Sequence, residues 1–330
     1  MVDVRRGSAV RAVLGAAISV VAIWLVLRGV DLARVGDVLR TADLRWVAFA
    51  ALLSSLDLSF RALRWQRLLR PIAHVRYLPM FGYLLIGYLA NNVLPARLGE
   101  LVRSHYLGDR EAISRASALG TVVVERVVDL VAVVAIASAA LLVLSVRGVV
   151  ASAVYVGAGV AGLFLVVLAL GIVAHRLPGA DRARALVDRW PRVRELARSL
   201  QGGLQVAGRP RTLAEALLAS AAAWTCSILA FAAVGQSIGL QLTIGQAALI
   251  GSGVALASAV PAGPSNLGTF ELAAVEIGKA IGVPAETAFA LALLTHATIL
   301  VVTSVGGAIA FTRIGWRRGE VSRPGPELSG

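Results

Sequence analysis

Long apolar runs constrain this chain more than any other feature of its sequence. Hydrophobic residues make up 58% of its 330 residues and charged residues 15%, against roughly 45–50% and about 25% in soluble domains. Several runs approach or exceed the roughly 18 residues that a bilayer-spanning helix needs. These values exclude a water-soluble globule and predict an all-α polytopic membrane protein. We expect about six full transmembrane helices, in residues 10–27, 44–60, 118–146, 149–174, 213–235 and 285–312.

Two further apolar stretches are interrupted by proline and glycine. Residues 77–94 run into the sequence NNVLPARLGE at 91–100, and residues 242–260 run into PAGPSNLGTFE at 261–271. Proline removes a backbone donor, and freed backbone groups at membrane depth need protein or water around them. We therefore expect two broken or re-entrant helical segments that line a cavity. Two ordinary spans with kinks are the alternative.

The distribution of positive charge predicts the orientation. Of the 32 Lys and Arg residues, 25 fall in five segments, 1–11, 61–76, 97–117, 175–211 and 313–330. Basic segments favour the cytoplasmic side, and all five can lie there only if the two broken segments enter the membrane from opposite sides. This predicts a plasma-membrane protein with both termini cytoplasmic. It also predicts an inverted repeat with a substrate site between its halves.

The predicted domain organisation is simple. Residues 1–312 form one transmembrane domain, and residues 313–330 form a disordered cytoplasmic tail. Residues 175–211 form a basic, amphipathic cytoplasmic loop on the inner membrane surface, or only an orientation signal without a ligand. The net charge of +13 is assigned to orientation and to anionic lipid headgroups. Nucleic acid is not predicted as a partner.

Charged residues near the apolar runs are the candidate functional groups, because an ionised side chain at the bilayer centre costs about 2.5–3.5 kcal/mol. Asp57 and Arg61 are spaced for a helix-end ion pair. Glu125, Arg126 and Asp129 enter a long apolar run, where neutralisation within the helix is the alternative to a function. The candidate substrate-binding residues are Arg61, Arg64, Asn92, Arg97, Glu100, Arg103, Glu125, Arg126, Asp129 and Glu271.

The breaks themselves suggest the chemistry of the ligand. A helix that begins at a break presents free N–H groups and a positive dipole end, which suit a phosphate. Arg97 would add positive charge. Glu100 and Glu271 would balance that charge, or would only cap the first helical turns. His296 is interpreted as a core histidine in preference to a proton relay.

Several pieces of the sequence together carry a family resemblance. The pattern N-N-x-L-P-x-R-x-G-E at 91–100, the E-R-x-x-D pattern at 125–129 and the P-x-G pattern at 261–263 resemble the lysylphosphatidylglycerol synthase transmembrane region family. The resemblance extends from about residue 10 to residue 312. It implies a flippase-like membrane domain that moves a lipid headgroup between leaflets. It does not extend to the soluble synthase domain of the best-known members, so lysyl transfer is not implied.

The preferred hypothesis is a flippase for a lipid or lipid-linked precursor with an anionic, phosphate-containing headgroup. Its partner would be a membrane phospholipid or a polyprenyl-phosphate-linked lipid. Signatures of soluble enzymes and ATPases are missing, so we expect no cofactor and no enzymatic role. One alternative is an intramembrane enzyme of lipid or glycan assembly, with Glu125, Asp129 and Glu271 as acid and base groups. Another is a non-transporting partner of a separate synthase or glycosyltransferase.

Overall fold

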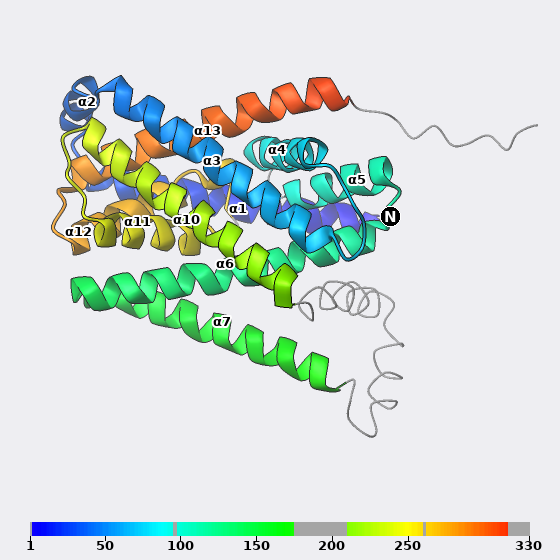
Figure 1. Ribbon diagram of the computed structural model, residues 1–330. Coiled ribbons are helices and arrows are strands. Elements are labelled where there is room, and N and C mark those ends of the chain that lie inside the picture. The colour runs from blue at the N-terminus through cyan, green and yellow to red at the C-terminus, as the bar shows by residue number, and fades with distance from the viewer. Residues whose placement is uncertain (1, 95–97, 175–209, 260–261, 316–330) are drawn as a thin grey trace, which may run out of the picture.

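The computed structural model describes residues 2–94, 98–174, 210–259 and 262–315, and within these residues it is all-helical (Figure 1). Arg97, most of the basic segment 175–211 and the tail from residue 316 lie outside the described residues. The helices are α1 (Val2–Arg28), α2 (Leu32–Arg40), α3 (Leu44–Leu69), α4 (Tyr77–Val93), α5 (Gly99–Glu111), α6 (Arg115–Leu144), α7 (Val149–Ala174), α10 (Pro210–Ser237), α11 (Ile244–Ala257), η2 (Pro264–Asn266), α12 (Thr269–Ala280) and α13 (Ala285–Ile314).

The six predicted spans all form helices, but their number as membrane spans is not confirmed. In the described part of the chain, α3, α6, α10 and α13 are long and apolar enough to cross a membrane. The helix from Leu14 to Arg28 qualifies only together with α2, across a bend of 86°. Helix α7 contributes a shorter apolar stretch, Val149–Leu163. The structure thus supports four spans, or five if the bent pair is one.

Local capping explains where several helices begin. The side chain of Asp31 accepts a hydrogen bond from the backbone of Ala33 at 2.9 Å and starts α2. Asp43 starts α3 in the same way, with its carboxylate 2.9 Å from the Arg45 nitrogen. Such caps satisfy backbone donors that have no partner within the helix. They fix the sharp turns that lead from α1 through α2 into α3.

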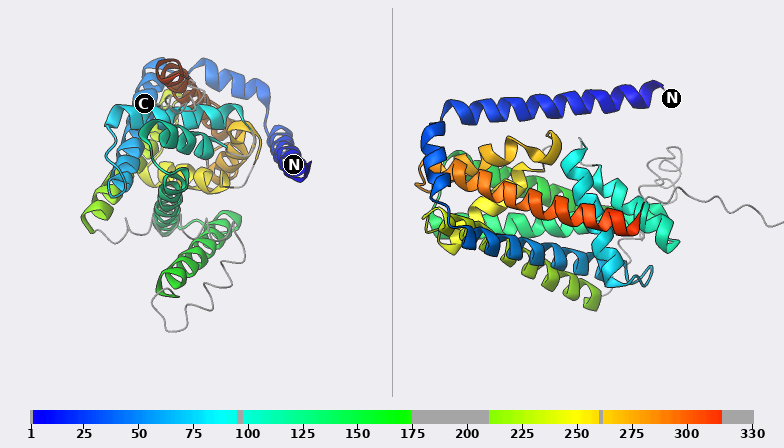
Figure 2. Two further views of the ribbon diagram at one scale, coloured as in Figure 1. Left: turned by 90° about the vertical axis from the view of Figure 1, so that its right-hand side faces the viewer. Right: turned by 90° about the horizontal axis from the view of Figure 1, so that it is seen from above.

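Each interrupted stretch forms two helices that pack against each other. Helices α4 and α5 form one hairpin, and α11 and α12 form the other. The α4–α5 contact is close because Gly99 lies against the carbonyl of Gly87, where any side chain would collide with backbone. Asn91 fixes the same contact, since its side-chain oxygen accepts a hydrogen bond from the Gly99 nitrogen at 2.7 Å. The hairpins lie toward opposite ends of the bundle (Figures 1 and 2).

The two hairpins meet where their helices break. The hydroxyl of Ser265, in η2, donates to the backbone oxygen of Asn92 at 3.3 Å. The Gly263 nitrogen donates to the hydroxyl of Ser19, in α1, at 2.9 Å. At Gly268 the backbone has φ +88°, which favours glycine, and an added side chain would strike the Ser19 carbonyl. The breaks of the two hairpins thus lie in contact, while the inverted repeat itself stays a prediction.

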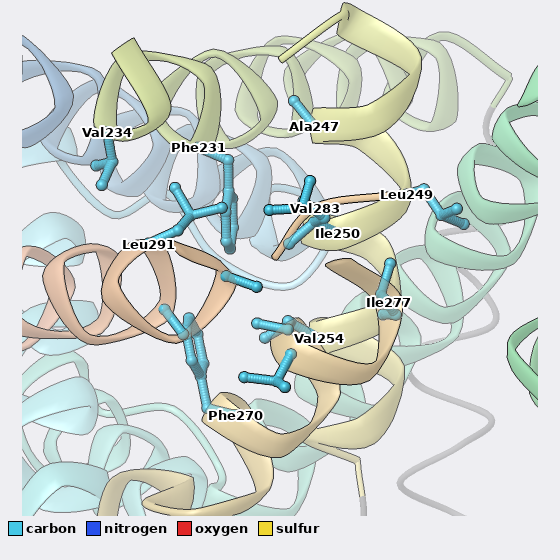
Figure 3. Close-up of a cluster of buried hydrophobic side chains, with 14 of the residues drawn as sticks. Phe231, Val234, Ala247, Leu249, Ile250, Val254, Phe270, Ile277, Val283 and Leu291 are labelled. Carbon is cyan, nitrogen blue, oxygen red and sulfur yellow. The ribbon is translucent and has the colours of Figure 1, made fainter. Parts of the chain in front are cut away.

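The largest apolar core surrounds the α11–α12 hairpin. Phe231 of α10, Ile250 of α11, Phe270 of α12 and Leu291 of α13 are all buried there (Figure 3). By contrast, large apolar side chains such as Leu142 are exposed on the outside of the bundle. An apolar exterior around a packed core suits a protein whose solvent is the bilayer.

The orientation can be tested with two single cysteines. Gly36 lies in α2, before the start of α3, and has no atom within 4 Å of an added Cβ; His74 follows the other end of α3. A helix of 26 residues spans about 39 Å, so these two sites lie at opposite membrane faces. With Cys226 replaced by alanine, Gly36→Cys should react with an impermeant thiol reagent outside intact cells, and His74→Cys only after lysis. The reverse labelling would invert the predicted orientation.

Candidate functional site

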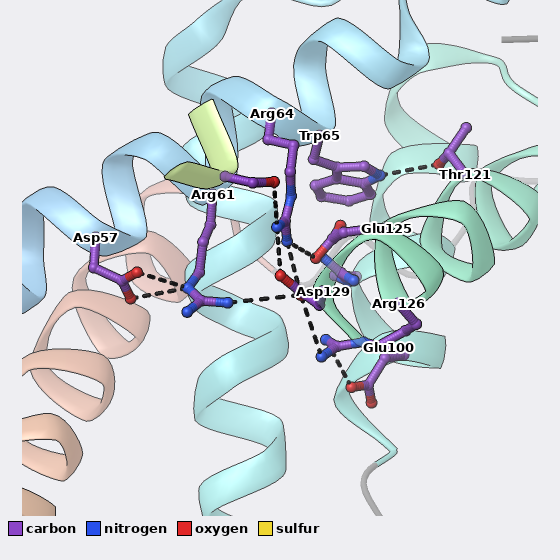
Figure 4. Close-up of polar contacts among 11 residues, drawn as sticks. Asp57, Arg61, Arg64, Trp65, Glu100, Thr121, Glu125, Arg126 and Asp129 are labelled. Atoms are coloured by element: carbon purple, nitrogen blue, oxygen red, sulfur yellow. Dashed lines mark hydrogen bonds and ion pairs between the residues drawn. The ribbon is translucent and has the colours of Figure 1, made fainter. Parts of the chain in front are cut away.

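Four arginines and four carboxylates form one connected set of ion pairs, which we call the charge network (Figure 4). They come from α3, α5 and α6, three helices that the chain brings together from distant positions. Their formal charges cancel, so the network is neutral as a whole. Its members are Asp57, Arg61, Arg64, Glu100, Arg103, Glu125, Arg126 and Asp129.

Arg64 lies at the centre of the network, with its side chain fully buried. Its Nη1 donates to Asp129 Oδ1 at 2.5 Å and to Ser220 at 3.0 Å. Its Nη2 donates to Glu125 Oε1 at 3.1 Å and to Asp129 Oδ2 at 2.9 Å. Arg103 donates to the other oxygen of Glu125 at 3.1 Å. One face of α6 supplies both carboxylates, because residues four apart on a helix lie side by side.

Neutralisation within α6 was the alternative to a function for Arg126 and Asp129. The contact between these two side chains is only a minor one. These two side chains are 4.0 Å apart, whereas Arg126 lies 3.2 Å from Glu100 of α5. Asp129 is instead held by Arg64 of α3. The charges on α6 are therefore balanced across helices, which local sequence spacing does not reveal.

Arg61 and Arg126 form the edge of the network that lines the cavity. The Nε of Arg61 donates to both oxygens of Asp57 at 2.9 Å, which confirms the predicted i, i+4 pair. Among the described residues, Arg61 donates hydrogen bonds through Nε alone; its Nη1 lies 3.7 Å from Asp129. The Arg126 side chain is 44% exposed. Both guanidinium groups keep donors for a ligand.

An internal cavity of about 350 Å³ begins at this edge. Its charged end is formed by Asp57, Arg61, Arg126 and Asp129, and its uncharged end lies beside the helix breaks. Aromatic side chains form part of the wall between them. The uncharged and aromatic lining residues include Asn92, Trp224, Phe231, Ser265, Phe270, Thr295, His296 and Thr303.

His296 and Glu271 form a buried pair at the uncharged end. The distance from His296 Nδ1 to Glu271 Oε1 is 2.5 Å, and His296 Nε2 lies 3.1 Å from the Ser265 carbonyl. A carbonyl only accepts, so His296 Nε2 is the donor in the contact with Ser265. Phe270 stacks on the imidazole with ring centroids 4.3 Å apart. The pair thus places an imidazole and a carboxylate in contact beside the cavity.

Glu271 also caps α12, since its second oxygen accepts a hydrogen bond from the Gly268 nitrogen at 2.6 Å. Glu271 therefore caps the helix, as the capping alternative predicted. It also contacts His296, which capping does not require. His296 is buried with both ring nitrogens in polar contacts, as expected of a core histidine, and it also lines the cavity. Glu271 and His296 are 25 residues apart on different helices, so no sequence periodicity links them.

Asn92 connects three elements at the same end of the cavity. Its amide donates to Thr303 at 2.8 Å and to Ser304 at 3.0 Å, both in α13. Its side-chain oxygen lies 3.4 Å from the Ser265 hydroxyl of η2. Asn92 therefore holds the break of α4 against α13 and against the second break.

The ten candidate residues divide into groups by position. Arg61, Asn92, Arg126 and Asp129 line the cavity. Arg64, Arg103 and Glu125 are buried behind it and hold the lining charges in place, and Glu100 pairs with Arg126. Glu271 contacts His296, which lines the cavity. Arg97, the tenth candidate, lies outside the described residues. Among the cavity residues that the sequence analysis left off its candidate set are Asp57, Trp224, Thr295 and His296.

An all-helical bundle with broken hairpins around a cavity lined by charged residues defines the class: an integral membrane protein with polar groups between its helices. The chain belongs to the lysylphosphatidylglycerol synthase TM region family, whose profile matches residues 12–307. This confirms the resemblance found in the sequence motifs.

Two curated relatives extend this comparison. Glycosyltransferase AglD of Haloferax volcanii is 27% identical over 334 residues, which cover 89% of this chain and 53% of the relative. A UPF0104 membrane protein of Methanothermobacter thermautotrophicus is 33% identical over 115 residues, 34% of each protein. The chain thus matches about half of the first relative's length and about a third of the second's.

The first relative contradicts one sequence-based prediction. We expected no enzymatic role, but a protein named as a glycosyltransferase matches most of this chain. The prediction was wrong because it rested on motifs of soluble enzymes and ATPases. Such motifs do not report on polar groups held inside a helical membrane bundle.

Proposed function

We propose that this chain binds the anionic, phosphate-containing headgroup of a lipid or lipid-linked precursor in its cavity and moves that headgroup between the leaflets of the plasma membrane. The observation that carries the proposal is the position of Arg61 and Arg126 at the charged end of an otherwise apolar bundle. Arginine binds phosphate through two parallel hydrogen bonds, which suits a site that must recognise a headgroup.

The neutrality of the charge network supports transport in preference to storage. A phosphate that binds Arg61 or Arg126 competes with Asp57, Asp129 and Glu100, which already hold these arginines. The carboxylates take the arginines back when the phosphate leaves. The empty network is neutral, so a bound phosphate adds negative charge, and the cost of that added charge opposes tight binding. A site balanced in this way releases its ligand on either side of the membrane.

Reconstitution tests this proposal. Liposomes that contain the purified protein should exchange a fluorescent anionic lipid, phosphatidylglycerol or a polyprenyl phosphate, between leaflets faster than protein-free liposomes. The measurement is the fraction of fluorophore quenched by an impermeant reductant over time. A zwitterionic phosphatidylcholine probe is the control and should stay near the protein-free rate. Protein-free rates for every anionic probe would refute the proposal.

Glycosyl transfer from a lipid-linked sugar is the second candidate function. It is favoured by the similarity to AglD and by the pair of His296 and Glu271, which could act as a general base at the cavity wall. The same proteoliposomes, given a lipid-linked hexose and a lipid acceptor, should then form a glycosylated product detectable by mass spectrometry. Glu271→Gln should abolish that product. Exchange without any product would favour the first candidate.

A further inference from the structure

Three arginines surround one carboxylate where α3 ends and α10 begins, outside the charge network. Glu215 Oε2 lies 3.0 Å from Nη1 of Arg67 and 3.7 Å from Nη1 of Arg70, and Glu215 Oε1 lies 3.4 Å from Nε of Arg211. Within the described ranges, these three arginines pair with no other carboxylate. We call the four residues the arginine cluster. The cluster keeps an excess of two positive charges, whereas the charge network is neutral.

The ends of the two helices do not neutralise this excess. Helices α3 and α10 pack side by side in opposite directions, since the Asp43 nitrogen before α3 donates to the Ser237 carbonyl of α10 at 2.8 Å. The last turn of α3 therefore lies beside the first turn of α10. A helix C-terminus carries about half a negative charge and an N-terminus about half a positive charge. These two partial charges cancel and leave the arginines uncompensated.

The arginine cluster lies where two membrane spans meet the headgroup region. The apolar span of α3 ends at Leu69, and that of α10 begins at Arg211. The side chains of Arg70 and Arg211 are 47% and 91% exposed. Leu218, which is 72% exposed, follows Arg211 by two helical turns on the same face of α10. It lies about 10 Å deeper along the helix, so a ligand here meets positive charge at its outer end and apolar surface below.

We propose that the arginine cluster binds the phosphodiester headgroups of anionic phospholipids in the leaflet at this end of the bundle. Arginine forms paired hydrogen bonds to phosphate, and two phosphodiester groups match the excess of two charges. The acyl chains then lie along the exposed apolar face of α10 that includes Leu218. None of the four described residues of the cluster lines the cavity. These lipids are therefore bound at the periphery, and the inference does not depend on what the cavity binds.

Lipid titration of charge-matched variants tests this site. Delipidated protein in a nonionic detergent is titrated with phosphatidylglycerol at low ionic strength, and bound lipids are resolved by native mass spectrometry. Phosphatidylcholine with the same acyl chains is the zwitterionic control. An arginine near the membrane surface strengthens the binding of anionic lipid about fivefold. The double variant Arg70→Gln/Arg211→Gln should therefore weaken the tightest phosphatidylglycerol binding about 10- to 30-fold.

The control variant is Arg34→Gln/Arg40→Gln, which removes the same charge from α2, at the opposite end of α3. Each of these arginines already has its own carboxylate, Asp31 at 3.6 Å and Asp37 at 3.4 Å. Phosphatidylglycerol should bind this variant as it binds the wild type. Weakening equal to that of Arg70→Gln/Arg211→Gln would show that only the net charge of the protein matters, and would overturn the proposal.

Glu215→Gln separates lipid binding from a purely structural role of the cluster. Glu215 competes with the phosphodiesters for the three arginines, so its neutralisation should tighten phosphatidylglycerol binding about fivefold. A carboxylate that only holds the arginines in place predicts the opposite, because its loss would disorder them. Unchanged or weaker binding by Glu215→Gln would therefore contradict the proposal.

Two further measurements identify the ligand and separate this site from the cavity. Soluble glycerol phosphate should compete poorly, because it lacks the acyl chains; competition as strong as that of phosphatidylglycerol would make this a site for a free anion and would refute the proposal. Equal binding of phosphatidylcholine and phosphatidylglycerol would also refute it. In liposomes, Arg70→Gln/Arg211→Gln should exchange the anionic probe at the wild-type rate. Loss of exchange in this variant would show that the cluster belongs to the transport path and not to a separate site.

Discussion

Replacing Arg126 with glutamine should remove most headgroup exchange while leaving the fold intact. A hydrogen bond to a charged group contributes about 1.5–3 kcal/mol, so losing this arginine should slow exchange by about 10- to 100-fold. The fold should tolerate the change because the Arg126 side chain faces the cavity and is 44% exposed, so a glutamine there keeps a hydrogen-bond donor beside Glu100. The measurement is the leaflet exchange of an anionic probe in liposomes.

Arg115→Gln is the matched control for this experiment. Arg115 also lies on α6, but it begins that helix and pairs with Asp109 at 2.7 Å, away from the cavity lining. Its replacement should leave exchange unchanged. Replacing Arg126 alone is a cleaner test than replacing Arg126 and Asp129 together, since Asp129 is also a partner of Arg64. If Arg126→Gln exchanged the probe at the wild-type rate, the role of Arg126 would be purely structural.

Replacing Arg64 with methionine should destabilise the protein more than any other single change in the charge network. The substitution leaves the buried carboxylates Glu125 and Asp129 without their central partner. Removing one member of a buried ion pair typically costs about 3–5 kcal/mol, which is a large share of the stability of most proteins. Chemical unfolding of the purified protein measures the difference in free energy.

Two further variants make this prediction specific. Arg67→Met, one turn beyond on α3, breaks a partly exposed pair with Glu215 at 3.0 Å and should cost about 1 kcal/mol or less. The combination of Arg64→Met with Glu125→Gln and Asp129→Asn should recover part of the lost stability, because it removes the unpaired charges as well. Equal stability of Arg64→Met and Arg67→Met would show that the network is hydrated and not buried.

The elements of the fold could largely be predicted from the sequence. Apolar runs determine α3, α6, α10 and α13, because a segment in lipid must satisfy its own backbone hydrogen bonds. Proline and glycine determine where the two interrupted stretches break. The number of spans could not be predicted in the same way. Whether α1 and α2 form one bent span depends on their 86° bend, which is set by packing and not by hydropathy.

The candidate site was predictable only where its contacts are local. The pair of Asp57 and Arg61 follows from a four-residue spacing on one helix. The pairing of Arg64 with Glu125, 61 residues away, and of His296 with Glu271 depends on how the helices rotate and pack. By itself the sequence determined which segments are helical, where they break and which charges they carry, because propensity, hydropathy and spacing act over a few residues. Only the tertiary structure decided which charges neutralise one another and which residues line the cavity, because those contacts form between helices whose relative rotation no local pattern specifies.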